Sequence, residues 1–251
     1  MSMIERDELE RYLNALLNIS KFKDYAPNGL QVEGRKSIHK VVTGVTACQA
    51  LLEAAVEYGA DAVLVHHGYF WRGDNPVVRG MHQRRLATLL KHNLSLFAYH
   101  LPLDAHSELG NNAQLAKRLS LTSETVLNEQ GVGNVGILAE PISLEAFGLK
   151  IEQVLQRKPV LVAGGEHLIQ RVAWCTGGAQ AYIQEALGFG VDAYLSGEIS
   201  EHTTHSAREN QLHYIAAGHH ATERYGVQAV GEHLALQFGI ECQFVEIDNP
   251  A

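Results

Sequence analysis

Residues 38–64, IHKVVTGVTACQALLEAAVEYGADAVL, recur in the second half of the chain as residues 169–195, IQRVAWCTGGAQAYIQEALGFGVDAYL. The second copy lies 131 positions after the first, and nine of the 27 aligned positions are identical without a gap. A period of this length is longer than that of solenoid repeats, and it is typical of a duplicated domain-sized unit. The sequence therefore predicts two related lobes with pseudo-twofold symmetry.

The first copy alternates between the periodicities of strands and helices. Apolar runs at 41–45, 62–65 and 94–99 are typical of buried strands, and residues 49–58 and 81–93 have helical spacing between them. This alternation predicts an α/β fold in which a βαβαβ unit is used twice, with mixed sheets. We expect one lobe from residues 1–125 plus 219–251, and the other from 126–218, so that the two are interlinked by the chain.

The length and charge of the chain limit the classes of function that it can have. With 251 residues and 46% hydrophobic composition, the chain can bury a substantial core, and its formal net charge is −8. A negative protein does not attract nucleic acid or an anionic membrane through its overall field. The three cysteines are far apart and fit no disulfide framework, and residues 1–11 are charged where a signal peptide is apolar. These features predict a cytoplasmic protein.

Five side chains of the types that bind metals occur in three short runs. His66 and His67 form the first, Asp104 follows His100 in the second, and His219 and Glu223 form the third. Each run follows a predicted strand, and strand ends are where an α/β sheet brings side chains to one crevice. Imidazoles and carboxylates together suit a divalent ion, so the pattern predicts a two-metal site.

The spacing within the third run places both donors on one face of a helix. His219 and Glu223 are four residues apart, as ligand pairs on helices are. Taken alone, such a pair is more often the solvated start of a helix, but the two other donor runs reverse that balance. Asp104 and Glu223 would offset the repulsion between two dications, with Glu223 able to bridge them.

The histidines of the first two runs have competing interpretations. Neighbours in a strand point to opposite faces, so His66 and His67 can serve one ion only if the strand ends at Gly68 or if two ions lie on either side of the pair. His100 is equally consistent with a strand-end histidine bound to backbone and with a ligand, or a partner that holds a ligand.

A further polar run occupies the repeat position of the histidine pair. Glu198 aligns with His67, and His202 and His205 follow it. Glu198 and His205 are candidates for a general base or proton shuttle, and His202 for a residue supporting the ligands. A solvated helix N-terminus is an equally good interpretation of residues 201–205.

The motifs together resemble a known family, the GTP cyclohydrolase 1 type 2 homologues, also called Nif-three-like proteins. The resemblance covers nearly the whole chain, is strongest for the short bacterial members, and rests on five motifs in order: Asn28-Gly-Leu-Gln-Val-Glu-Gly34, Val65-His-His-Gly68, His100-Leu-Pro-Leu-Asp104, Ser196-Gly-Glu198 and Gly218-His-His-Ala-Thr-Glu223. It implies two α/β lobes, a dinuclear centre of divalent zinc, manganese or iron, and a toroidal homohexamer.

Carried over by position, the family's ligands fall on His66, His67, Asp104, His219 and Glu223. One departure is Thr46, which stands where many relatives carry an aspartate. A threonine cannot ligate strongly, so a catalytic role for that position is not carried over.

Two functions from different classes follow from this resemblance. One is a metal-dependent hydrolase, similar to a cyclohydrolase, that acts on a nucleotide or related heterocycle through a water activated by the ions. The other is a non-catalytic metal-binding ring that scaffolds or regulates partners, and the absence of a phosphate-binding P-loop favours it somewhat. The aromatic segment 68–76 is either a substrate-facing lid or an oligomer contact.

Overall fold

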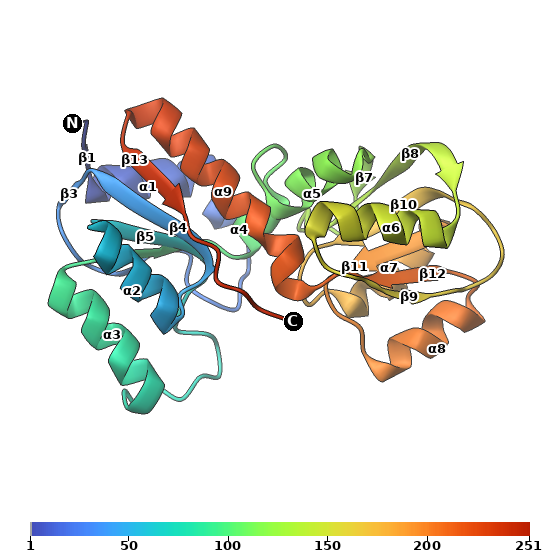
Figure 1. Ribbon diagram of the computed structural model, residues 1–251, viewed down its shortest axis with the longest axis horizontal. Helices are drawn as coiled ribbons and strands as arrows, with labels where there is room; N and C mark the ends of the chain where they lie inside the picture. Colours follow the sequence, from blue (N-terminus) through green and yellow to red (C-terminus); the bar gives the residue numbers. More distant parts are fainter. Residues whose placement is uncertain (1) are drawn as a thin grey trace. The chain divides into compact units, whose positions relative to one another are not determined.

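The computed structural model describes residues 2–251, and it divides into two compact units (Figure 1). Unit 1 comprises Met1–Leu103 and Gly226–Asp248, and unit 2 comprises Asp104–Tyr225 and Asn249–Ala251. The chain leaves unit 1 at Leu103 and returns to it within helix α9 (His219–Phe238). Residues 104–125 and 219–225, expected in the first lobe, lie in unit 2 because helix α5 and the first turns of α9 pack into its core.

Unit 1 is built on a five-stranded sheet with the order β13-β4-β5-β6-β2 (Figure 1). Helices α2 (Gln49–Tyr58) and α3 (Gly80–His92) cover one face, and α1 (Arg6–Leu16) packs on the other with part of α9. Strands β4, β5, β6 and β13 are parallel, and β2 is antiparallel at the edge. The strands are β2 (Gly29–Val32), β4 (Lys40–Thr46), β5 (Ala62–His67), β6 (Ser95–Ala98) and β13 (Glu241–Phe244).

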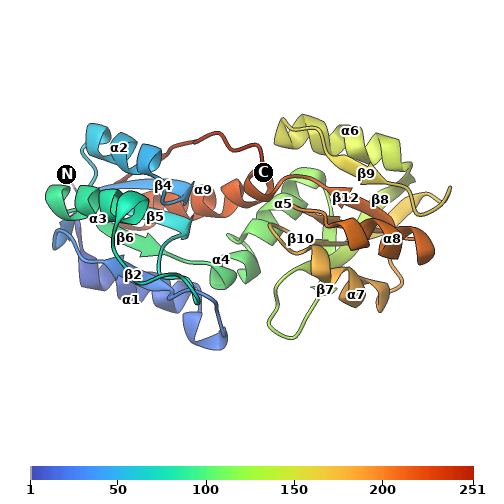
Figure 2. The same cartoon turned by 90° about the horizontal axis from the view of Figure 1, so that it is seen from below.

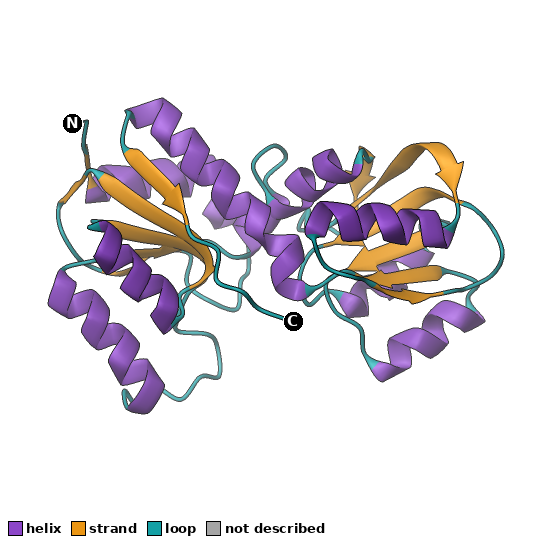
Figure 3. Cartoon of the chain, in the orientation of Figure 1, coloured by secondary structure: helices purple, strands orange, loops and turns teal. Residues whose placement is uncertain are grey.

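Unit 2 has a six-stranded sheet with the order β7-β8-β10-β11-β12-β9 (Figure 3). Strands β10, β11 and β12 are parallel, and antiparallel strands flank them on both sides. Helices α5 (Asn111–Leu119) and α6 (Leu144–Leu155) share one core cluster with the sheet, and α8 (Glu201–Glu209) contacts β12 and α7 (Ile183–Leu187). The strands are β7 (Thr122–Val126), β8 (Asn134–Ile142), β9 (Val160–Val162), β10 (Ile169–Cys175), β11 (Ala193–Ser196) and β12 (His213–Ala216).

The remaining elements are short. Strands β1 (Ile4–Glu5) and β3 (Ser37–Ile38) form a separate two-stranded ladder, and 3-10 turns η1 and η2 span Ile19–Lys21 and Gln180–Tyr182. Helix α4 (Leu101–Ala105) follows β6 directly (Figure 2). No helix within residues 2–251 combines the length and apolar character needed to cross a membrane.

The duplication expected from the sequence is present in the register of the sheets. Val41 pairs with Ala62 in unit 1, and Val172 pairs with Ala193 in unit 2, so each residue of the first pair lies 131 positions before its equivalent in the second. Both parallel cores end in an antiparallel edge strand, β2 beside β6 and β9 beside β12. The α/β fold class with mixed sheets and an internal repeat is therefore confirmed.

Equivalent aspartates join the first two strands of each repeat. Asp61 Oδ2 accepts hydrogen bonds of 2.8 and 3.1 Å from two backbone N–H groups at the start of β4. Asp192 Oδ2 accepts bonds of 2.9 and 2.7 Å from the corresponding groups of β10. A carboxylate shielded from water requires such donors, which explains why this position is identical in the two copies.

Candidate metal centre

Three imidazoles gather at the strand ends of unit 1. His66 and His67 close strand β5, and His100 follows β6. One ring nitrogen from each lies within 4.8 Å of those of the other two. The ring centroids of His66 and His67 are only 4.5 Å apart, because the strand ends at this pair and the alternation of its side chains stops. The group offers three nitrogen donors to a divalent ion.

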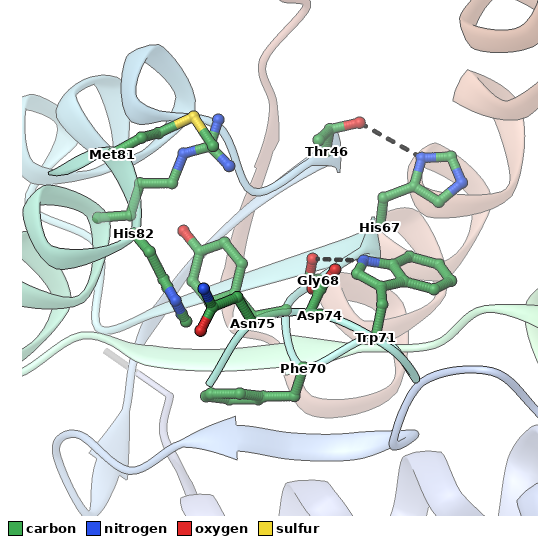
Figure 4. Close-up of a pocket in the computed structure, with 11 residues that line it drawn as sticks. Thr46, His67, Gly68, Phe70, Trp71, Asp74, Asn75, Met81 and His82 are labelled. Carbon is green, nitrogen blue, oxygen red and sulfur yellow. Dashed lines mark hydrogen bonds between the residues drawn. The ribbon is translucent and has the colours of Figure 1, made fainter. Parts of the chain in front are cut away.

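The rings of His66 and His67 are held by their Nδ1 atoms. His66 Nδ1 lies 2.9 Å from the backbone oxygen of Tyr99, and the ring is completely buried. His67 Nδ1 lies 3.3 Å from the hydroxyl of Thr46, as Figure 4 shows. Hydrogen bonding through Nδ1 fixes the tautomer and makes Nε2 the candidate donor to a metal. The residue that departs from the family pattern, Thr46, therefore has an orienting role.

His100 is held in the same way by a carboxylate. Its Nδ1 lies 2.7 Å from Oδ1 of Asp24, and Oδ2 of the same carboxylate accepts bonds of 2.9 Å from the side chain of Asn28 and the backbone N–H of Leu101. Burial raises the pKa of Asp24, but these bonds and the charge of His100 outweigh it and lower the pKa to about 2. No pattern in the sequence singled out Asp24.

Unit 2 contributes two buried carboxylates and one imidazole. Helix α9 begins at His219. The Nε2 atom of His219 lies 3.1 Å from Oε2 of Glu223, one turn later in the helix. On its other side, His219 Nδ1 lies 2.6 Å from Oε1 of Glu198. Glu223 is 3% exposed and Asp104 is 5% exposed. Carboxylates this deeply buried are stabilised by a nearby positive charge, which protonated His219 supplies to Glu223 and a divalent ion would also supply.

The two glutamates also control the protonation of His219. Burial lowers the pKa of this imidazole, but hydrogen bonds and charges from Glu223 and Glu198 outweigh burial and raise the pKa to about 9. A metal ion that binds His219 therefore displaces a proton at neutral pH. Glu198, a candidate general base in the sequence, is here the hydrogen-bonding partner of His219 Nδ1.

Asp104 is fixed by polar side chains that the sequence did not single out. Its Oδ1 atom accepts hydrogen bonds from Asn111 Nδ2 at 2.9 Å and from Thr176 Oγ1 at 3.2 Å. The neighbouring Asn112 binds both the backbone oxygen of Asp104 and the backbone N–H of Thr176. The carboxylate is therefore held in one orientation. Only the position of Thr176 after a predicted strand could have suggested this role.

A glycine leaves room for the carboxylate of Glu223. Gly177 follows β10 and has a φ of +71°, and a Cβ atom there would lie 1.9 Å from Glu223 Oε1 and 3.2 Å from His219 Nε2. Its backbone N–H donates to the hydroxyl of Thr222, which ties this loop to the first turn of α9. The local chain thus fits two candidate ligands, His219 and Glu223, against the bare backbone of Gly177.

The other predicted residues lie in solvent on helix α8. His205 is 63% exposed at its side chain, and its partner among the described residues is Glu201, 3.1 Å away. His202 is also exposed. Their contacts are those of a solvated helix face, the second of the two interpretations that the sequence left open.

These features agree with comparisons to known proteins. The family model described as Duf34/NIF3 (NGG1p interacting factor 3) matches residues 4–250. The chain is 56% identical over 248 residues to a protein of Pseudomonas aeruginosa named GTP cyclohydrolase 1 type 2 homolog, covering 98% of this chain and 96% of the relative. It is 52% identical over 250 residues to the protein of that name from Escherichia coli K12, covering 99% and 100%. The chain belongs to the Duf34/NIF3 family.

Solved structures give the same result for the fold. The protein ybgI, described as having unknown function, superposes with a TM-score of 0.96 at 52% identity, covering 99% of this chain and all of that one. The protein TTHA1606 from Thermus thermophilus gives a TM-score of 0.91 at 35% identity, also with 99% and 100% coverage. The family resemblance drawn from the five motifs is therefore confirmed.

Proposed function

We propose that this protein is a metal-dependent hydrolase with a dinuclear divalent centre whose ligands are His66, His67, Asp104, His219 and Glu223. The observation that carries the proposal is the set of orienting bonds: every one of the three histidines is held through Nδ1. Side chains that are merely buried have no need for a common orientation of this kind. The arrangement is typical of histidines whose Nε2 binds a metal.

The two units supply complementary halves of such a donor set. Unit 1 provides neutral nitrogen donors, and unit 2 provides carboxylates with one imidazole. Neutral ligands leave the repulsion between two dications uncompensated, whereas carboxylates reduce it. The chain passes from Leu103 to Asp104 at the boundary between the units, so the two halves are directly linked in sequence.

When bound, two divalent ions lower the pKa of a water molecule and polarise the bond under attack. The residues of the chain then position the reactants and move protons. Glu198 holds His219 through one carboxylate oxygen, and its other oxygen accepts a bond of 3.2 Å from Gln180. Because its side chain is 41% exposed, Glu198 can take up a proton released during hydrolysis. His205 remains a second candidate for that transfer.

The test is a hydrolysis screen in which zinc, manganese or ferrous iron is restored to the purified protein before nucleotides and nitrogen heterocycles are added. We expect turnover that requires the metal and that is lost in Glu223→Gln and His219→Ala while both remain folded by circular dichroism. Glu201→Gln, at a side chain that is 85% exposed, is the matched control. Retention of full metal content and turnover in both ligand variants contradicts the site. Bound metal without turnover on any substrate favours the non-catalytic scaffold.

A further inference from the structure

A cavity of about 340 Å³ lies within unit 1 beside His67, between the loop that follows β5 and helix α3 (Figure 4). Aromatic side chains from residues 69–71 form one part of its lining, and mostly polar side chains from residues 74–85, with Met81, form another. Small-molecule sites range from about 300 to 1,000 Å³. The cavity is therefore large enough for one fused ring with a small substituent and too small for a polymer.

The aromatic part is held in place by its neighbours. Trp71 donates from Nε1 to the backbone oxygen of Gly68 at 3.2 Å, and its ring meets that of His100 edge-on with centroids 4.8 Å apart. The Trp71 and His67 centroids are 5.9 Å apart. A fixed indole next to a proposed metal ligand offers a face on which a planar ring can stack.

Phe70 adds a second aromatic surface in an unusual backbone conformation. Its φ is +64°, and its side chain is 43% exposed. A bulky residue with positive φ is uncommon, and such strain is concentrated at sites that bind ligands. The loop thus presents a partly exposed apolar ring to the cavity.

The polar part contains a cation that the fold does not use. Arg85 lines the cavity, and its side chain makes no hydrogen bond or ion pair with any residue in the described range 2–251. Asp74 and Asn75 line the same space from the aromatic loop. A half-buried guanidinium suits an anionic group, most of all a phosphate, which it binds with two parallel hydrogen bonds.

We propose that this cavity is the substrate-binding subsite and that it takes a planar nitrogen heterocycle carrying a phosphate. The ring stacks on Trp71 and Phe70, the phosphate binds Arg85, and the amide of Asn75 with the carboxylate of Asp74 binds the N–H and C=O groups on the ring edge. This inference rests on the proposed hydrolase function, and it names the class of substrate that reaches His67.

The experiment uses the intrinsic fluorescence of the metal-containing protein as purified. The chain has two tryptophans, and Trp174 is completely buried in the core of unit 2, so quenching by a ligand reports on Trp71. Guanosine 5′-monophosphate and guanosine are the two probes. We expect saturable quenching by both, with the phosphate strengthening binding roughly 10- to 100-fold, as a charge-assisted hydrogen bond does.

Variants test whether Arg85 is responsible for the stronger binding that the phosphate gives. Arg85→Gln should remove most of the phosphate advantage and leave guanosine binding unchanged, whereas the neighbouring Arg84→Gln should keep both. Trp71→Phe should abolish the quenching. The proposal is overturned if neither probe quenches saturably, if the two arginine variants behave alike, or if quenching persists in Trp71→Phe. It is also overturned if Trp71→Phe lowers the molecular mass in solution, since the loop would then be a contact between copies.

Metal content, measured on each variant, separates this proposal from the function on which it rests. Arg85→Gln should retain the metal of the unaltered protein. Phosphate-dependent binding in a protein without metal would contradict the proposed hydrolase function and support the subsite. Metal-dependent turnover that is insensitive to Arg85→Gln would support the hydrolase function and contradict the subsite.

Discussion

The two units share the same arrangement of central parallel strands and differ in the side chains at the ends of those strands. Their parallel cores have the same register, and equivalent aspartates, Asp61 and Asp192, bind the same backbone groups. Equivalent glycines, Gly59 and Gly190, have left-handed backbones after the first helix of each copy. At the end of the second strand, however, unit 1 has His67 where unit 2 has Glu198.

This difference indicates which residues of the repeat are constrained by folding. The aspartates and glycines satisfy backbone hydrogen bonds and left-handed turns that any chain with this topology requires. Side chains at the carboxyl ends of the strands contribute little to the sheet, so each copy can carry different chemistry there. At this position the first copy has the imidazole of His67 and the second has the carboxylate of Glu198.

The largest expected effect comes from Gly177→Ala. The new Cβ atom would lie 1.9 Å from Glu223 Oε1, so the carboxylate must move and metal affinity should fall more than about 100-fold. Gly190→Ala and Gly59→Ala are matched controls, because their φ values are +60° and +72° and no atom lies within 4 Å of the added carbon. Each control should lose about 1 kcal/mol of stability and keep its metal. Chelator competition and urea unfolding measure the two quantities, and equal metal affinity in all three variants would remove the proposed role of Gly177.

The side chains that bind Nδ1 of His219 and of His67, Glu198 and Thr46, should differ in their effect on metal affinity. Glu198→Gln should weaken metal binding by about 10- to 100-fold, because it removes a charged partner from His219 Nδ1. Thr46→Val removes a neutral hydroxyl 3.3 Å from His67 Nδ1, and its effect should be no more than about tenfold. Competition with a chelator ranks the variants, and a larger loss in Thr46→Val would reverse the assignment of the stronger partner to unit 2.

Metal affinity should also depend on pH through His219. Its pKa of about 9 lies above the usual 6.5, so the metal-free protein holds a proton there that the ion must displace. Affinity should therefore rise by up to about tenfold per pH unit as pH approaches 9, and then level off. Correspondingly, the stabilisation of metal-free protein by this proton is complete below 6.5 and is lost as pH rises through about 9.

Glu198→Gln tests the origin of that dependence. Because the carboxylate helps to raise the pKa of His219, its removal should lower the pH at which affinity levels off. Metal titrations at several pH values, run on both proteins, locate the two plateaus. An unchanged plateau in the variant would show that Glu223 alone sets the pKa.

The smallest effects are expected at the shared aspartates. Asp61→Asn and Asp192→Asn each weaken two hydrogen bonds to backbone and should lower stability by about 1–3 kcal/mol without changing metal content. Asp61→Asn should cost more, since Asp61 also pairs with Arg35 at 2.8 Å. Urea unfolding checks the order, and loss of metal in either variant would link the scaffold to the site.

Much of the fold could be predicted from the sequence because it depends on local periodicity and on the repeat. Helix α2 has the expected bounds, 49–58, and strands β4, β5 and β6 overlap the runs expected at 41–45, 62–65 and 94–99. Strands β7 and β13 were missed, because their side chains are mostly exposed and lack a buried face to mark them.

The candidate ligands were found because their residue types are chemically distinctive, whereas the residues that hold them were not. Asp24 and Thr176 contact His100 and Asp104 across 76 and 72 positions of sequence. Such long-range hydrogen bonds leave no local pattern. Glu198 was found through its place in the repeat, but its contact with His219 required the structure.

The most direct test of the dinuclear centre is metal analysis of freshly purified protein by inductively coupled plasma mass spectrometry, together with the same measurement on Glu223→Gln. The proposal predicts close to two ions per chain, drawn from zinc, manganese and iron, and a marked loss in the variant. A protein that carries no metal and takes up none when these ions are supplied would contradict it.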